Sequence, residues 1–138
     1  MTRGFILVAA LVVAFALAGC GSSKKARPAP VTVDARGRTQ VEVDAHLDAF
    51  TPEAVIVDVG TTVTWRNQDT VAHNIETFTS AADFGGPFGA DTSQFGPGAT
   101  YAFTFRKVGT FHYTCTIHSL MNGVVDVRAP AAGTTSTT

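Results

Sequence analysis

Apolar and polar residues alternate through much of the chain, and this alternation limits the possible folds most strongly. The pattern is clearest in residues 55–59, 101–105 and 111–115, where every second side chain is Val, Phe, Tyr or Cys. A period of two is typical of a β-strand with one buried face, because successive side chains in a strand point to opposite faces of the sheet. Turns that contain glycine separate these segments, and residues 31–35 and 40–46 are two further strand candidates.

One stretch departs from the alternation. Residues 79–95 are rich in glycine and show neither the strand period nor a helical period. We therefore expect this stretch to be an excursion from the sheets, with one short helical turn near residues 80–83. For the remainder, the sequence predicts an all-β fold, namely an antiparallel β-sandwich of about six to eight strands.

The composition is that of one small globular domain. The 138 residues leave room for a single core, and a content of 45% hydrophobic and only 15% charged residues excludes wholesale disorder. The net charge of -1 lacks the basic excess that binding to a phosphate backbone needs, so nucleic acid is not an expected partner. Residues 129–138 contain nothing to bury and are predicted to be a disordered tail, which leaves residues 31–128 as the domain.

The N-terminus has the pattern of an export signal. Residues 5–18 form a nearly unbroken apolar run after a short basic start, but a membrane-spanning helix needs about 20 such residues. The segment Leu17-Ala18-Gly19-Cys20 resembles a bacterial lipobox. This resemblance implies that residues 1–19 are a removed signal peptide and that Cys20 carries a lipid. Residues 20–30 are then a flexible tether, and we expect a lipoprotein anchored on the outer side of the bacterial cytoplasmic membrane.

Three residues with metal-binding side chains follow one another at intervals of three, namely Cys115, His118 and Met121. They lie on a short loop between two predicted strands, and His73 follows another predicted strand, from which it can supply a fourth ligand. If Cys20 carries lipid, Cys115 has no disulfide partner within the chain, because the sequence contains 2 cysteines. One thiolate, two imidazoles and one thioether are the ligands of a copper site with a long axial Met. The sequence therefore predicts one type 1 copper ion.

The prediction of copper depends on the joint spacing of these side chains, because each of them alone is more often a core or surface residue. A dinuclear copper centre needs two neighbouring cysteines and a trinuclear centre needs paired His-x-His motifs, and the sequence has neither. Zinc is disfavoured because a thioether is a poor zinc ligand. Four ligands leave no open position for a substrate, so an enzyme is not expected. The remaining histidines, His46 and His112, are interpreted as structural or surface residues.

Residues 67–74 contain a His-Asn pair, and residues 109–121 contain the spacing Cys-x-x-His-x-x-Met. These segments resemble the copper-binding segments of the amicyanin and plastocyanin branch of the cupredoxins, and the spacing is that of the short amicyanin-like loop. The resemblance extends over about residues 50–127. It implies a Greek-key β-sandwich that transfers one electron at a time by Cu(II)/Cu(I). One position departs from the family, because Ile117 stands where the family usually has proline.

The resemblance also implies contacts around the ligands. The backbone N–H of Asn74 is expected to point at the Cys115 sulfur, and the Asn67 side chain is expected to bond to Thr116 and brace the loop. Ile117, unlike proline, has an N–H group. Either this group donates a second hydrogen bond to the sulfur, in which case Ile117→Pro lowers the midpoint potential, or it faces water.

In the cupredoxins that these segments resemble, the histidine ligand that corresponds to His118 is the ligand nearest to solvent, and an apolar patch surrounds it. Ile117, Ser119 and Leu120 flank it here, so this loop is the expected docking patch for redox proteins, and the protein is expected to be a monomer. Two other functions stay open at this point. One is a copper-binding lipoprotein that stores or delivers the metal, and the other is a metal-free β-sandwich interaction module.

Overall fold

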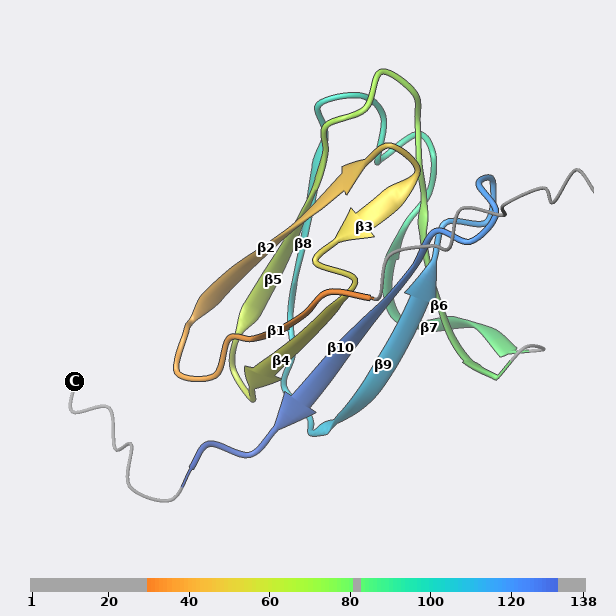
Figure 1. The fold of residues 1–138 in the computed structure, drawn as a ribbon. Coiled ribbons are helices and arrows are strands. Elements are labelled where there is room, and N and C mark those ends of the chain that lie inside the picture. The colour runs from red at the N-terminus through yellow and green to blue at the C-terminus, as the bar shows by residue number, and fades with distance from the viewer. Residues whose placement is uncertain (1–29, 81–82, 132–138) are drawn as a thin grey trace, which may run out of the picture.

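The structure, a computed structural model, describes residues 30–80 and 83–131. The expected signal peptide, Cys20, nearly all of the tether and most of the tail lie outside these residues. In the described part of the chain, no helix is long and apolar enough to cross a membrane. Figure 1 shows these residues folded as two β-sheets packed face to face.

The described residues form ten strands, and the all-β sandwich predicted from the sequence is confirmed. One sheet has six strands in the order β1-β4-β10-β9-β6-β7, and the other has four in the order β3-β2-β5-β8. The strands are β1 (Thr32–Asp34), β2 (Gln40–His46), β3 (Ala49–Thr51), β4 (Ala54–Asp58), β5 (Thr62–Asn67), β6 (Ile75–Ser80), β7 (Asp83–Ala90), β8 (Thr100–Thr104), β9 (Gly109–Thr114) and β10 (Asn122–Arg128).

Two details of the predicted sandwich are wrong. The strand count is higher than expected, partly because β1 and β3 have only 3 residues each, too few for alternation to be visible. The pairing is also not purely antiparallel, since β1 with β4, β4 with β10 and β2 with β5 are parallel. Alternation predicts a strand and its buried face, but it carries no information on the direction of the neighbouring strand.

The stretch 79–95 is not the excursion that the sequence suggested. Strands β6 and β7 pair antiparallel, with Ile75 opposite Ala90 and Ser80 opposite Asp83. The helical turn was expected near residues 80–83; its two end residues lie in these strands, and residues 81–82 lie outside the described residues. The register of this pair shifts twice, on either side of Phe78. Such irregularities interrupt a period of two, which is why the sequence shows no alternation here.

The core is aromatic and joins the two sheets. Trp65 of β5 is fully buried, stacks on Phe88 of β7 at 5.3 Å between ring centroids and meets the edge of Tyr113 of β9 at 5.4 Å. Phe50 of β3 also meets Tyr113 edge to face, at 4.9 Å between centroids. Burying side chains of this size stabilises a fold by about 2–3 kcal/mol each. Tyr113, two residues before Cys115, is therefore held by aromatic contacts with two buried rings of the opposite sheet.

The strand directions bring four loops to one end of the sandwich, the upper end in Figure 1. Strands β2, β5, β7 and β9 end there, and β6, β8 and β10 begin there, as their pairing registers require. The loops are residues 47–48, 68–74, 91–99 and 115–121. All four predicted metal ligands lie on two of these loops.

Candidate metal centre

The four predicted ligands lie where β9 meets β10 and where β5 leads to β6. Cys115 directly follows β9, Met121 directly precedes β10, and His118 lies midway between them. His73 is in the loop from β5 to β6, which crosses from the four-stranded sheet to the six-stranded sheet. His73 therefore comes from a different loop than Cys115, His118 and Met121.

The ligand atoms converge. The Cys115 sulfur lies 3.7 Å from Nδ1 of His73 and 3.5 Å from Nδ1 of His118. The two imidazole rings meet edge to face with centroids 4.6 Å apart. The three donor atoms lie within 4.8 Å of one another, a spacing that lets them share one metal ion.

The ligands differ in their exposure to solvent. His73 and Met121 are fully buried, and Cys115 is buried as well. The His118 side chain is 26% exposed and is thus the edge of the site that reaches the surface. The surrounding side chains exclude water from the thiolate and leave one imidazole edge accessible.

The ligand loop is closed at its base by backbone contacts. The N–H of Cys115 donates to the carbonyl of Met121 at 2.9 Å, and the hydroxyl of Thr114 donates to the same carbonyl at 3.0 Å. Leu120 has a positive φ of 68°, so the chain turns sharply just before Met121. The loop thereby places the first and the last of its three ligands side by side.

A second connection ties the ligand loop to the loop of His73, and it corrects one expectation. Thr116 bonds to Asn74, not to Asn67: its N–H donates to Oδ1 of Asn74 at 2.8 Å, and Nδ2 of Asn74 donates to its hydroxyl at 2.9 Å. Asn67 instead donates to the carbonyls of Val71 and Phe95 at 2.9 and 3.0 Å. The asparagine next to His73 therefore braces the two loops, whereas Asn67 fixes the start of its own loop.

The sulfur contacts in this structure also differ from those expected. Within the described residues, the polar groups at hydrogen-bond distance from the Cys115 sulfur are the two ring nitrogens of His73 and His118. The backbone N–H of Asn74 does not form the expected hydrogen bond to the sulfur, and of the two alternatives for Ile117, its N–H does not form the second hydrogen bond. Ile117 is 52% exposed, in keeping with a position on the outer side of the loop.

Sequence reasoning missed Asp69. Its carboxylate lies 2.8 Å from Nε2 of His73 and 3.3 Å from Nδ1 of His46. Partial burial raises the pKa of this carboxyl, but the N–H groups of Leu47 and His73 that donate to it outweigh burial and hold the pKa below its ordinary value. The sequence does show a carboxylate residue four positions before the predicted ligand His73, and this spacing could have indicated the contact. His46 is exposed, as expected, and Asp69 is its polar neighbour.

The donor set fits copper. A buried thiolate with two imidazole nitrogens and a neighbouring thioether is the combination that selects copper over hard cations. Nδ1 of both histidines faces the sulfur, and Nε2 of each points away from it toward a carboxylate, that of Asp69 at 2.8 Å and that of Asp48 at 3.8 Å. The nitrogens turned toward the sulfur are therefore free to accept a metal. Residues 37–128 match the family model described as copper-binding proteins, plastocyanin/azurin family.

The chain belongs to this family. Amicyanin-alpha from Methylorubrum extorquens is 36% identical over 96 residues, which cover 67% of this chain and 73% of that protein. Amicyanin from Paracoccus denitrificans is 31% identical over 125 residues, which cover 88% of this chain and 92% of that protein. A solved amicyanin variant in the reduced state superimposes with a TM-score of 0.53 at 31% identity, over 64% of this chain and 81% of that one.

The same fold occurs within a larger enzyme. Copper-containing nitrite reductase from Thermus scotoductus matches with a TM-score of 0.55 at 30% identity, over 66% of this chain. This chain spans only 23% of that enzyme. The present cupredoxin is a blue-copper electron carrier with a type 1 site formed by His73, Cys115, His118 and Met121, and it is not an enzyme. When bound, the metal supplies the Cu(II)/Cu(I) couple.

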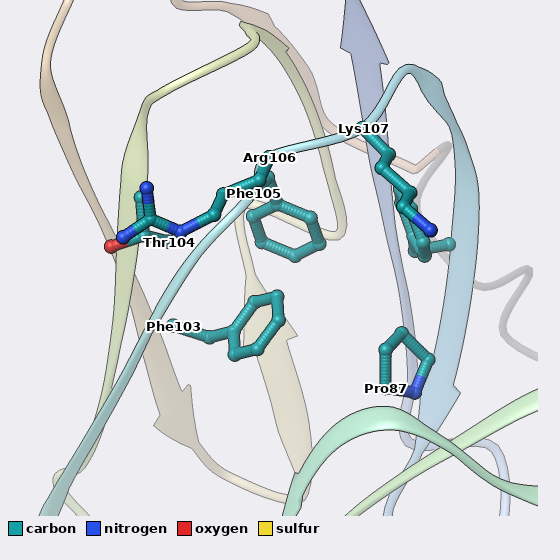
Figure 2. A pocket seen from close by; sticks show the side chains of 7 residues that line it. Pro87, Phe103, Thr104, Phe105, Arg106 and Lys107 are labelled. Atoms are coloured by element: carbon teal, nitrogen blue, oxygen red, sulfur yellow. The ribbon is translucent and has the colours of Figure 1, made fainter.

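A separate cavity of about 480 Å³ lies where β8 ends and β9 begins, at the end of the sandwich away from the metal ligands. Its lining residues are Pro87, Phe103, Thr104, Phe105, Arg106, Lys107 and Phe111. Figure 2 shows the rings of Phe103 and Phe105 facing this space and the Arg106 side chain turned away from it.

Replacing Met121 tests whether this side chain holds the copper or only tunes its midpoint potential. In Met121→Gln, we expect the blue colour to remain and the midpoint potential to fall, because an amide oxygen is a harder donor than a thioether and favours Cu(II). Met121→Leu is the matched control, since it keeps the buried apolar volume without a donor and is expected to shift the potential upward. Voltammetry and visible spectra of both variants measure this. Loss of colour in both would show that Met121 holds the copper rather than tunes it.

Proposed function

We propose that this cupredoxin carries electrons between redox proteins on the outer side of the cytoplasmic membrane, and that they enter and leave through His118. The observation that supports this route is the exposure of the four ligands, because His118 alone among them reaches the surface. An electron carrier needs both a donor and an acceptor. Both must approach the same imidazole edge, so their contacts with the protein are expected to be brief.

The surface around His118 suits brief contacts. Ile117 is 52% exposed and Leu120 is 71% exposed, and Ser119 between His118 and Leu120 is exposed and uncharged. Leu47, which is 78% exposed, adjoins Asp48, whose carboxylate lies 3.8 Å from Nε2 of His118. We define the docking patch as Ile117, Ser119 and Leu120, with Leu47 beside it. A small apolar patch favours transient redox complexes that bury less than about 1,200 Å².

We further propose that a lipid on Cys20 holds the domain at the membrane. The described strands begin at Thr32 and end at Arg128, which supports a domain of residues 31–128 between the tether and the tail. The tether of residues 20–30 reaches at most about 3.3–3.6 Å per residue, or roughly 36–40 Å in all. Such a reach lets the docking patch turn toward partners in or near the membrane.

Electron self-exchange, in which a reduced molecule of the protein passes its electron to an oxidised one, tests the docking patch. In Leu120→Glu, we expect the electron self-exchange rate between oxidised and reduced molecules to fall about tenfold or more, because a carboxylate buried in each contact costs more than about 1.4 kcal/mol. NMR line broadening in mixtures of the two oxidation states measures this rate, and the visible spectrum is expected to stay unchanged.

The matched control is Val108→Glu, which adds the same charge at a 60% exposed site between β8 and β9, at the other end of the sandwich. Its self-exchange rate is expected to stay close to that of the unmodified protein. Equal rates in Leu120→Glu and the unmodified protein would exclude the loop of His118 as the docking surface.

A further inference from the structure

The carboxylate of Asp69 connects two elements at the metal end of the sandwich. Oδ2 accepts from Nε2 of His73 at 2.8 Å and from the N–H of Asp48 at 3.4 Å. Oδ1 accepts from the N–H of Leu47 at 2.9 Å and lies 3.3 Å from Nδ1 of His46. One side chain therefore contacts both a buried ligand and the turn between β2 and β3.

The turn from β2 to β3 depends on such a contact. Leu47 and Asp48 both have positive φ angles, 53° and 54°, a backbone region that is costly for residues with a side chain. Asp69 accepts from both of their N–H groups, which compensates part of that cost. The same turn places Asp48 near the exposed ligand, with its carboxylate 3.8 Å from Nε2 of His118.

Asp69 also determines which nitrogen of His73 carries the proton. Nδ1 faces the Cys115 sulfur and must be free of a proton to bind a metal, so the proton belongs on Nε2. Asp69 accepts that proton's hydrogen bond, and its side chain is only 12% exposed, so water screens its charge weakly. The His73 ring is fully buried and has no freedom to find another acceptor in solvent.

We propose that Asp69 is a positioning residue that fixes the tautomer and orientation of His73, joins this ligand to the turn from β2 to β3, and lowers the midpoint potential of the site. A hydrogen bond from a ligand imidazole to a carboxylate makes the ring a stronger donor, and a nearby negative charge favours the more highly charged metal state. Both effects favour Cu(II) over Cu(I). The inference rests on the copper site described above. It adds a residue that does not bind the metal itself but holds the ligand His73 in place.

The test is Asp69→Asn in the copper-loaded full chain. We expect a higher midpoint potential by voltammetry and a Cu(II) affinity that is about 10- to 100-fold weaker, the usual cost of losing such a partner. The EPR spectrum of Cu(II) is expected to change, because the His73 ring is held less firmly. Asp69→Glu keeps the charge and is expected to restore part of the potential shift.

The matched control is Asp58→Asn. Asp58 ends β4, at the opposite end of the sandwich, and its carboxylate likewise accepts from a loop amide, that of Gly37 at 2.7 Å. This variant loses the same charge and is expected to leave the potential and the EPR spectrum unchanged. If Asp69→Asn shifts the potential no more than Asp58→Asn does, Asp69 only caps the turn and the inference is wrong.

A measurement on the unmodified protein keeps the test valid if Asp69→Asn does not fold. In the diamagnetic Cu(I) form, NMR is expected to show a slowly exchanging, hydrogen-bonded proton on Nε2 of His73. An Nε2 proton that exchanges freely with water would overturn the inference. A protein that shows no blue band at all would instead contradict the copper site, so the two failures are distinguishable.

Discussion

In Cys115→Ala, the blue absorption band is expected to disappear and copper binding to weaken by more than the roughly 10- to 100-fold that the loss of an outer partner costs. The colour of a type 1 site comes from the Cu(II)–thiolate bond, and the described residues contain no other cysteine. Visible absorption during a titration with Cu(II), together with calorimetry, measures both effects. The metal-free fold is expected to survive, because only one buried sulfur atom is removed.

The matched control is Cys20→Ala, which removes the other thiol of the sequence. Its band and copper affinity are expected to equal those of the unmodified chain. Full colour in Cys115→Ala would contradict the assigned thiolate. Reversible one-electron voltammetry of the unmodified protein completes the comparison, because an electron carrier must keep its copper bound in both oxidation states.

The ligands could be predicted from the sequence because three of them lie within one loop. Cys115, His118 and Met121 are separated by intervals of three, so a tight connection between two paired strands must bring them together, as the structure shows. His73 needed only the further assumption that its strand ends at the same end of the sandwich. The ligand set thus depended on local spacing and on strand direction, both of which a sequence expresses.

The contacts around the ligands could not be predicted in the same way. Asn67 and Asn74 both lie near His73 in the sequence, and which side chain reaches Thr116 depends on the path of the loop through space. Asp69 was missed for a similar reason. Its role depends on Leu47, which lies 22 residues earlier and comes close only after β2 and β5 pair.

Strand prediction succeeded where one face is buried and the register is regular. Strands β2 and β5 keep their alternation over 7 and 6 residues, because each has one face against the core. The pair β6 and β7 contains two register shifts, and β7 includes glycine and proline. Such irregularities break the alternation without preventing the pairing, so the sequence concealed a hairpin that the structure contains.

Gly123 of β10 is the position at which the packing beneath the metal loop leaves least room. It lies directly opposite Tyr113 of β9, and a Cβ atom at this position would overlap with the ring and the hydroxyl group of Tyr113. The ring cannot move aside, because Trp65 contacts it at 5.4 Å and Phe50 at 4.9 Å between centroids, and both are buried. The strand needs glycine here for space, because Tyr113 fills the volume that a side chain would occupy.

In Gly123→Ala, we expect the free energy of unfolding to fall by about 3 kcal/mol, at the upper end of the usual cost of overpacking. Urea denaturation of the metal-free protein measures this. Gly96→Ala is the control, because a Cβ there has no neighbour within 4 Å and its φ is not positive, so little change is expected. If overlap with Tyr113 is the cause, Tyr113→Leu makes room, and the double variant is expected to be more stable than the sum of the two single losses predicts. Strictly additive losses would place the cause elsewhere in the strand.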